Sequence, residues 1–219
     1  RPWLDSISGG RSEEINDAFL VDRPDLNSGQ LMMATATSSA FTMPAIRFSE
    51  ALSSTGSPVW MYQFSLPSNQ HDGRMGSPHA MELPFMFGNL GAEPALLDPS
   101  DNEAEYEQLA ADMQDAWIAF ARDGDPSTEA LGTWPRYEPT ARKTMMFDLD
   151  RGVVSDPFSI ERTVWGDIPF DGVTPPLLES NPLTAADTEV TIPVVMAVIG
   201  PVWTTVIIVG AVALIVGVA

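Results

Sequence analysis

Cysteine is absent from the 219 residues, and histidine occurs only twice, as His71 and His79. A chain without cysteine has no disulfide, no thiolate metal ligand and no cysteine nucleophile. Neither histidine stands in a cluster of further ligand residues, so the sequence predicts no metal site. We expect no cofactor.

Positive charge is also scarce. The chain has 11 Lys and Arg against 30 Asp and Glu, a formal net charge of -19 at pH 7. This balance argues against nucleic acid as a partner, because a phosphate backbone requires a basic surface. Residues 190–219 carry no charged side chain at all, so the chain divides into an acidic body and an apolar tail.

The body contains the alternating helix and strand patterns of an α/β protein. A short helix is predicted around residues 13–20, and a second one over 41–52, with Thr42 as its N-cap and Pro44 in its first turn. Residues 57–64 are almost entirely apolar and rich in aromatics and valine, which is typical of a strand buried on both faces of a sheet.

The second half of the body predicts a long helix and a hairpin. Apolar residues recur at helical spacing over 100–122, with Ser100 and Glu103 forming a capping box and Gly124 ending the helix. The pattern of residues 144–154 predicts a hairpin of two strands joined by a turn at Asp150-Arg-Gly152.

The two histidines lie in or after the polar loop 65–78 that follows the predicted buried strand. We expect His71 to be a solvated surface residue. His79 is the stronger functional candidate, because functional groups of α/β folds sit on loops beyond the strand ends. Leu83, Phe85 and Phe87 alternate with other residues after it, so we expect these three side chains to pack on the sheet and to position the His79 loop.

Five segments resemble, in order and spacing, those of the type-B carboxylesterase and cholinesterase family. They are Phe41-x-x-Pro44-Ala-x-Arg47, Pro58-Val-Trp-x-Tyr62-x-Phe64, Gly76-x-x-His79-x-x-Glu82-Leu-Pro-Phe-x-Phe-Gly88, Trp117-x-x-Phe120-Ala-Arg122-x-Gly124-x-Pro126, and Trp134-Pro-x-Tyr137 with Arg142-x-Thr144-Met-x-Phe147. One position departs from the family pattern: Ser38 stands where the family usually has Asp.

The resemblance implies an α/β-hydrolase fold over residues 1–165 and a Ser–acid–His triad that acts on small carboxylic esters. His79 matches the general base of that triad. Glu82 is expected to be a buried neighbour of the histidine loop and not the triad acid, and Glu13 and Glu14 are expected to form a solvated helix start.

The nucleophile elbow Gly-x-Ser-x-Gly occurs nowhere in the chain. We therefore expect the C-terminal portion of a serine esterase, which needs an upstream serine and acid for activity. Two alternatives stay open: a non-catalytic cholinesterase-like binding or adhesion module with a membrane anchor, and an inactive truncated remnant.

Beyond the body, residues 166–189 are acidic and contain four prolines, as expected of a linker. Residues 190–219 are long enough to cross a bilayer, since about 20 apolar residues suffice, and predict a transmembrane helix. A soluble hairpin turning at Gly200-Pro201 and a cleaved lipid-anchor signal are the alternatives. The expected location is membrane-anchored with the body outside the cytoplasm, or secreted if the tail is not a membrane segment.

Overall fold

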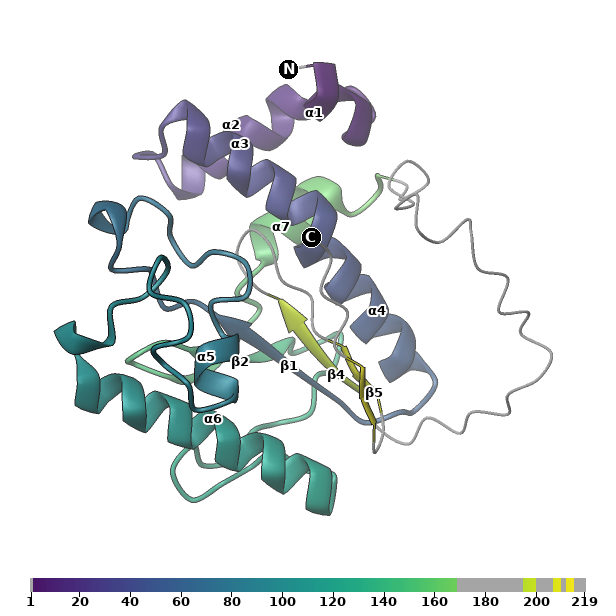
Figure 1. The fold of residues 1–219 in the computed structure, drawn as a ribbon. Helices are drawn as coiled ribbons and strands as arrows, with labels where there is room; N and C mark the ends of the chain where they lie inside the picture. The colour runs from purple at the N-terminus through teal and green to yellow at the C-terminus, as the bar shows by residue number, and fades with distance from the viewer. Residues whose placement is uncertain (1, 169–194, 200–206, 210–211, 215–219) are drawn as a thin grey trace, which may run out of the picture.

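A computed structural model describes residues 2–168 and three short strands of the tail (Figure 1). The helices are α1 (Pro2–Ile7), α2 (Ser12–Asp22), α3 (Ser28–Thr37), the π-helical turn η1 (Ser38–Thr42), α4 (Met43–Ser54), η2 (His71–Gly73), α5 (Leu83–Met86), η3 (Pro99–Asp101), α6 (Glu103–Asp123) and α7 (Ser159–Trp165). The strands are β1 (Val59–Phe64), β2 (Lys143–Phe147), β3 (Gly152–Ser155), β4 (Val195–Ile199), β5 (Ile207–Val209) and β6 (Val212–Leu214).

The strands form one mixed sheet in the order β3-β2-β1-β4-β5-β6. β1 pairs in parallel with β2 on one edge and with β4 on the other, while β3, β5 and β6 extend the sheet with antiparallel pairs. All six residues of β1 are buried, which confirms the predicted strand with both faces covered. The hairpin of β2 and β3 is confirmed as well.

Helices cover both faces of β1 (Figure 1), because its side chains alternate between two apolar clusters. Trp60, Tyr62 and Phe64 pack with α5, α6 and β2 on one face. Val59 and Met61 pack with α2, α4 and α7 on the other. The fold class is therefore α/β, with a layer of helices on each side of the sheet.

The predicted helix 41–52 is part of a longer helical segment that also contains α3 and η1. Thr42 is not an N-cap: its backbone is helical and its side chain makes no capping hydrogen bond. The helix start lies instead at Asn27, whose side chain accepts hydrogen bonds from the Gly29 and Gln30 amides. Thr42 lies in the π-turn, where the helix takes up one wider turn without stopping.

The long helix α6 confirms the prediction for 100–122, with one change at its start. Ser100 belongs to the short turn η3, where the Asp98 side chain accepts from its amide, and α6 begins three residues later at Glu103. Gly124 ends the helix in the left-handed conformation, with φ of 72°, as expected of a glycine at that position.

The prediction of a transmembrane helix over 190–219 is wrong for the part of the tail that the structure describes, since β4, β5 and β6 are strands of the sheet. Their residues are mostly valine, isoleucine and alanine, and β-branched side chains favour strands. Within residues 2–168 and these strands, no helix is long and apolar enough to span a bilayer. Most of the predicted linker, and the turn predicted at Gly200-Pro201, lie outside the described residues.

Pairing with β4 should protect the backbone amides of β1 from hydrogen exchange. In a chain shortened to residues 1–189, one edge of β1 loses its hydrogen-bonding neighbour. Amide hydrogen exchange of residues 59–64 should then accelerate by about tenfold, the equivalent of about one net hydrogen bond of ~1.4 kcal/mol. Helix α6 serves as the internal reference, and its exchange should change less. Equal exchange of β1 in both chains would show that the tail does not pair with it.

Candidate active site

His79 lies in a tight turn that follows the loop after β1. The amide of Met81 donates to the Pro78 carbonyl at 3.2 Å, which closes the turn around His79 and Ala80. Ala80 has a φ of 66°, a left-handed conformation that costs a non-glycine residue about 1–3 kcal/mol and is found preferentially at functional sites. The fold thus holds His79 in a strained turn.

Hydrogen bonds hold both ends of the loop that leads to His79. The Ser68 amide donates to the Gly76 carbonyl at 2.7 Å, and the Ser68 hydroxyl donates to the Leu96 carbonyl at 2.6 Å. Asn69 binds the Asp98 carbonyl and the Asp101 carboxylate. Ser77 donates to the Phe64 carbonyl at the end of β1, at 3.4 Å. These bonds hold the loop at the carboxyl end of the strand.

Burial affects the ionisation of His79. The side chain is partly buried, and loss of hydration lowers its pKa below the ordinary value of 6.5. The imidazole is therefore neutral at pH 7, which is the form that accepts a proton. His71 is exposed in η2, as predicted for a surface residue.

Glu82, three residues beyond His79, is buried with 2% of its surface exposed, which agrees with the predicted buried neighbour of the histidine loop. Its negative charge adds to the burial that raises the pKa of Tyr62 on β1. Glu13 and Glu14 lie exposed at the start of α2, as expected, and Glu14 pairs with Arg11 at 2.7 Å.

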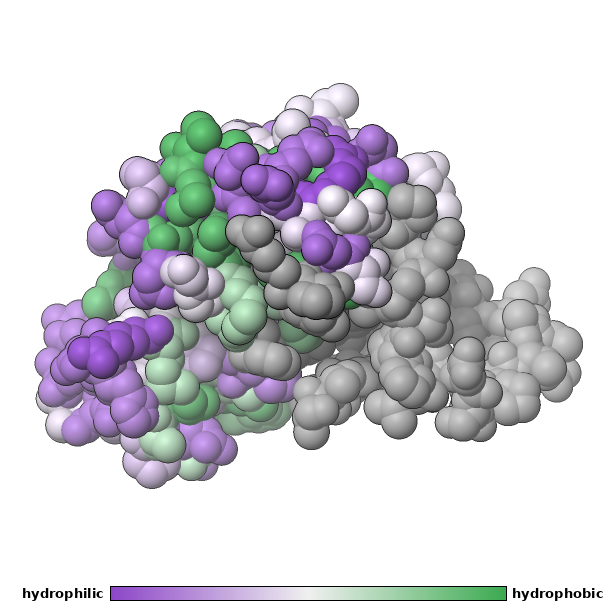
Figure 2. All heavy atoms as spheres, turned by 90° about the horizontal axis from the view of Figure 1, so that it is seen from above, coloured by the Kyte–Doolittle hydropathy of each residue, from purple (hydrophilic) through white to green (hydrophobic). Residues whose placement is uncertain are grey.

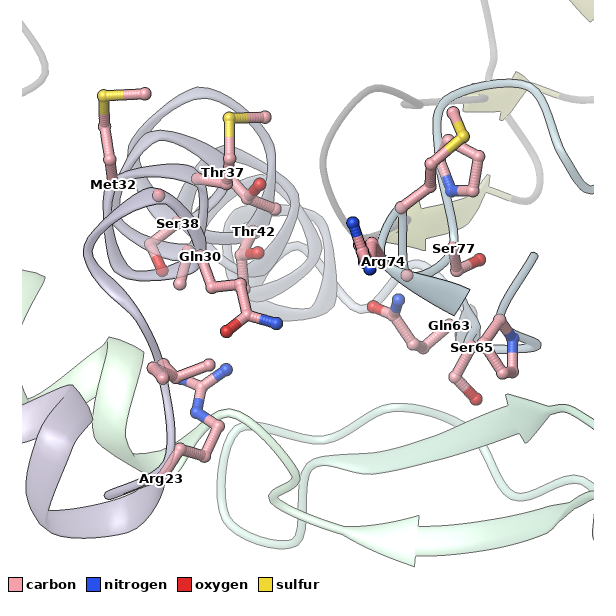
Figure 3. A pocket seen from close by; sticks show the side chains of 18 of the residues that line it. Arg23, Gln30, Met32, Thr37, Ser38, Thr42, Gln63, Ser65, Arg74 and Ser77 are labelled. Atoms are coloured by element: carbon pink, nitrogen blue, oxygen red, sulfur yellow. The ribbon is translucent and has the colours of Figure 1, made fainter. Parts of the chain in front are cut away.

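A cavity of about 930 Å³ opens beside the His79 turn (Figure 3). Gly76, Ser77 and Pro78, the three residues before His79, line one side of it. The opposite wall is formed by α3 and η1, and Gln63 and Ser65 contribute the end of β1. Its volume is that of a small-molecule site. In the described part of the chain no group of three or more His, Asp or Glu side chains is placed to hold a metal ion.

The sequence predicted His79 but not the cavity beside it. Ser38 was noted only as a departure from the family pattern, and it proves to be buried in η1 and to line this cavity. Arg23, Gln30, Gln63 and Arg74 come from four separate segments. Only the fold brings them together, and no spacing in the sequence indicates it.

Known proteins of similar sequence bear the names of esterases. The para-nitrobenzyl esterase of Bacillus subtilis (strain 168) is 38% identical over 122 residues, which are 56% of this chain and 24% of the esterase. Human carboxylesterase 3 is 35% identical over 105 residues, 43% of this chain and 18% of the human protein. The chain spans less than a third of the length of these relatives and of the structures compared next.

Solved structures agree in fold. A carboxylesterase of Geobacillus stearothermophilus superposes with a TM-score of 0.59 at 29% identity, covering 69% of this chain and 31% of that structure. A thermophilic para-nitrobenzyl esterase gives a TM-score of 0.54 at 31% identity, covering 74% and 32%. The model of the carboxylesterase family matches residues 12–163. By sequence and by fold, the chain belongs to the carboxylesterase family.

Proposed function

We propose that the chain is the C-terminal portion of a serine carboxylic ester hydrolase and that His79 is its general base. The observation that carries the proposal is the position of His79: a strained turn beyond a buried parallel strand, beside a cavity of ligand size. Membership of the carboxylesterase family supports the reaction class. Relatives bear the names para-nitrobenzyl esterase, phenmedipham hydrolase and carboxylesterase 3, and a small carboxylic ester is the proposed substrate.

In this role neutral His79 accepts the proton of a serine hydroxyl while that oxygen attacks the ester carbonyl. The imidazolium then gives the proton to the leaving alcohol. Water repeats the sequence and releases the acid from the serine. In residues 1–219 burial lowers the pKa of His79, which favours the neutral imidazole that enters this step.

The chain alone contains no Gly-x-Ser-x-Gly segment, so the proposal places the serine and the triad acid upstream. The test begins with the reading frame directly upstream of Arg1. The protein that joins this upstream sequence to residues 1–219 should hydrolyse para-nitrophenyl butyrate, whereas residues 1–219 alone should not exceed the buffer rate.

Two results would contradict the proposal. An upstream hydrolase domain in which the elbow serine is replaced would favour the non-catalytic binding module. An upstream frame without hydrolase sequence would favour the inactive remnant.

A transmembrane helix is no longer proposed for the tail, because β4, β5 and β6 are strands of the sheet. Contact of residues 190–219 with a lipid bilayer stays a prediction, as does an extracytoplasmic location. The uncharged composition of the tail motivates both. Alkaline carbonate extraction of membranes from cells that express residues 1–219 or 1–189 is the measurement. Equal release of the two proteins would show that the tail does not anchor the chain.

A further inference from the structure

The cavity beside His79 has two arginines in its lining, in a strongly acidic protein. Three charged side chains are among the residues placed around it: Arg23, Arg74 and Glu161. Figure 3 shows Arg23 and Gln30 on one side of the cavity and Arg74, Gln63 and Ser77 on the other. The whole chain carries a net charge of -19 and repels anions at long range. Both arginines contact carboxylates of the protein, so an anionic ligand has to take the place of one of these carboxylates.

The two arginines differ in how far they are already engaged. The Arg23 guanidinium contacts Glu161 at 3.2 Å and Asp22 at 3.4 Å, so most of its charge is compensated within the protein. Arg74 contacts Asp72 at 3.3 Å, and both of these side chains are more than 80% exposed. An exposed pair of this kind contributes about 0–1 kcal/mol, so Arg74 can exchange Asp72 for a ligand carboxylate at little cost.

The backbone turns sharply in the three residues before Arg74. His71, Asp72 and Gly73 all have positive φ, at 52°, 58° and 71°. Two of these are not glycine, and consecutive left-handed residues of this kind persist only where the surroundings impose them. The Arg74 amide donates to the His71 carbonyl at 3.2 Å, which closes the loop directly before the side chain enters the cavity wall.

Apolar side chains fill the spaces between these polar groups. The cavity is also lined by Leu26, Met32, Met33, Met75, Pro78 and Phe158. Met32 and Met75 are 49% and 38% exposed at its edge. Figure 2, which looks down on the helices at the top of Figure 1, shows apolar surface beside strongly hydrophilic surface. A ligand that fits such a lining has an apolar body and a charged end.

We propose that Arg74 is a specificity-determining residue and that the cavity binds esters that carry a free carboxylate, such as a monoester of a dicarboxylic acid. The guanidinium pairs with this carboxylate, in two parallel hydrogen bonds where both oxygens are within reach. The apolar alcohol portion lies against the methionines. The inference rests on the proposed ester hydrolysis and names its substrate class.

Direct binding to residues 1–219 tests the inference, because the measurement requires no nucleophile. Isothermal titration compares monobenzyl succinate with benzyl methyl succinate, its neutral counterpart of nearly equal size. The monoanion should bind at least about tenfold more tightly, the effect of one charge-assisted hydrogen bond. Arg74→Gln should reduce this preference to within about twofold. Since Arg74 is exposed, this variant should keep the circular dichroism spectrum of the unmodified chain.

Arg122→Gln is the matched control. Arg122 is also exposed and paired with an exposed aspartate, Asp123, but it lies at the end of α6 and not at the cavity. This variant should keep the full preference for the monoanion. Equal binding of the two esters, absence of binding by both, or a preference that survives Arg74→Gln would each overturn the inference. Equal losses in the two variants would also overturn it, since they would indicate a general effect of net charge.

The binding result stands apart from the proposed function. Hydrolysis of the neutral para-nitrophenyl butyrate by the joined protein tests the reaction, and the binding preference of residues 1–219 tests the substrate class. Hydrolysis without a preference for anions would therefore reject only the substrate class, and a preference without hydrolysis would reject only the reaction.

Discussion

Replacing His79 by asparagine in the protein that joins the chain to its upstream sequence should lower kcat/KM for para-nitrophenyl butyrate by at least about a thousandfold. Loss of one member of a Ser–His–acid triad has effects of this size or larger, because the serine then has no base to accept its proton. KM should change much less, since His79 lies next to the cavity-lining residues and is not one of them.

The second histidine provides the control. His71→Asn makes the same change of side chain on the exposed face of the same loop, and asparagine tolerates the left-handed conformation found there. It should leave kcat/KM within about twofold. Similar losses in both variants would show that the loop, and not the base, was damaged.

Ionisation of His79 gives an independent readout of the same assignment. In this chain burial lowers its pKa. An upstream triad carboxylate would stabilise the imidazolium and raise the pKa. NMR titration of His79 should therefore show a higher pKa in the joined protein than in residues 1–219. An unchanged or lower pKa would mean that no carboxylate reaches it.

Truncating Phe85 to alanine should destabilise residues 1–219 by about 3–5 kcal/mol, the range for removal of a buried phenylalanine. The ring is fully buried between β1 and α6, with centroids 5.2 Å from Phe64 and 6.0 Å from Tyr106. It anchors the short helix α5 directly after the His79 turn. Urea denaturation of both proteins, followed by tryptophan fluorescence, measures the difference.

Phe87→Ala is the matched comparison, because Phe87 stands two residues away with 65% of its surface exposed. Its loss should change the free energy of unfolding by less than about 0.5 kcal/mol. A loss below about 1 kcal/mol for Phe85→Ala would contradict the packing described for that ring.

The pair also shows where the sequence pattern failed. Alternation of Leu83, Phe85 and Phe87 predicted that all three pack on the sheet, but residues 83–86 form a helical turn and Phe87 points to solvent. A four-residue segment is too short to distinguish a period of 2 from one of 3.6. Both patterns predict that Phe85 is buried, and it is.

Longer elements were predicted better. The apolar run of β1, rich in aromatics and valine, and the helical spacing of apolar residues in α6 indicate the type of each element, and both are present nearly as expected. The start of the 28–54 helical segment was missed because Thr42 and Pro44 resemble a helix start, while the π-turn that contains Thr42 has no marker of its own. Tail residues 195–199 were taken for a membrane helix because they belong to a long uncharged apolar run, and an apolar run suits a buried strand equally well.

For the candidate site, the motif around His79 was sufficient to select the histidine. The arginines were not predictable, because Arg23 and Arg74 acquire a shared cavity only when α3 lies opposite the end of β1. The sequence also does not indicate that the charge of Arg23 is compensated, because its partner Glu161 is far away in the sequence and is brought close only by the fold.

The central position of β1 has a consequence for the synthesis of the chain on the ribosome. Both of its neighbours are encoded later: β2 follows about 80 residues after it and β4 about 130. At about 5–20 residues per second, the six residues of β1 leave the exit tunnel roughly 4–16 s before β2 is complete. The interval before β4 is complete is longer, though less than about twice as long. During that interval β1 lacks the two partners that β2 and β4 later supply, and unpaired apolar strand edges favour aggregation. Slow synthesis should therefore favour aggregation of this chain, and a chaperone that binds residues 59–64 would protect it.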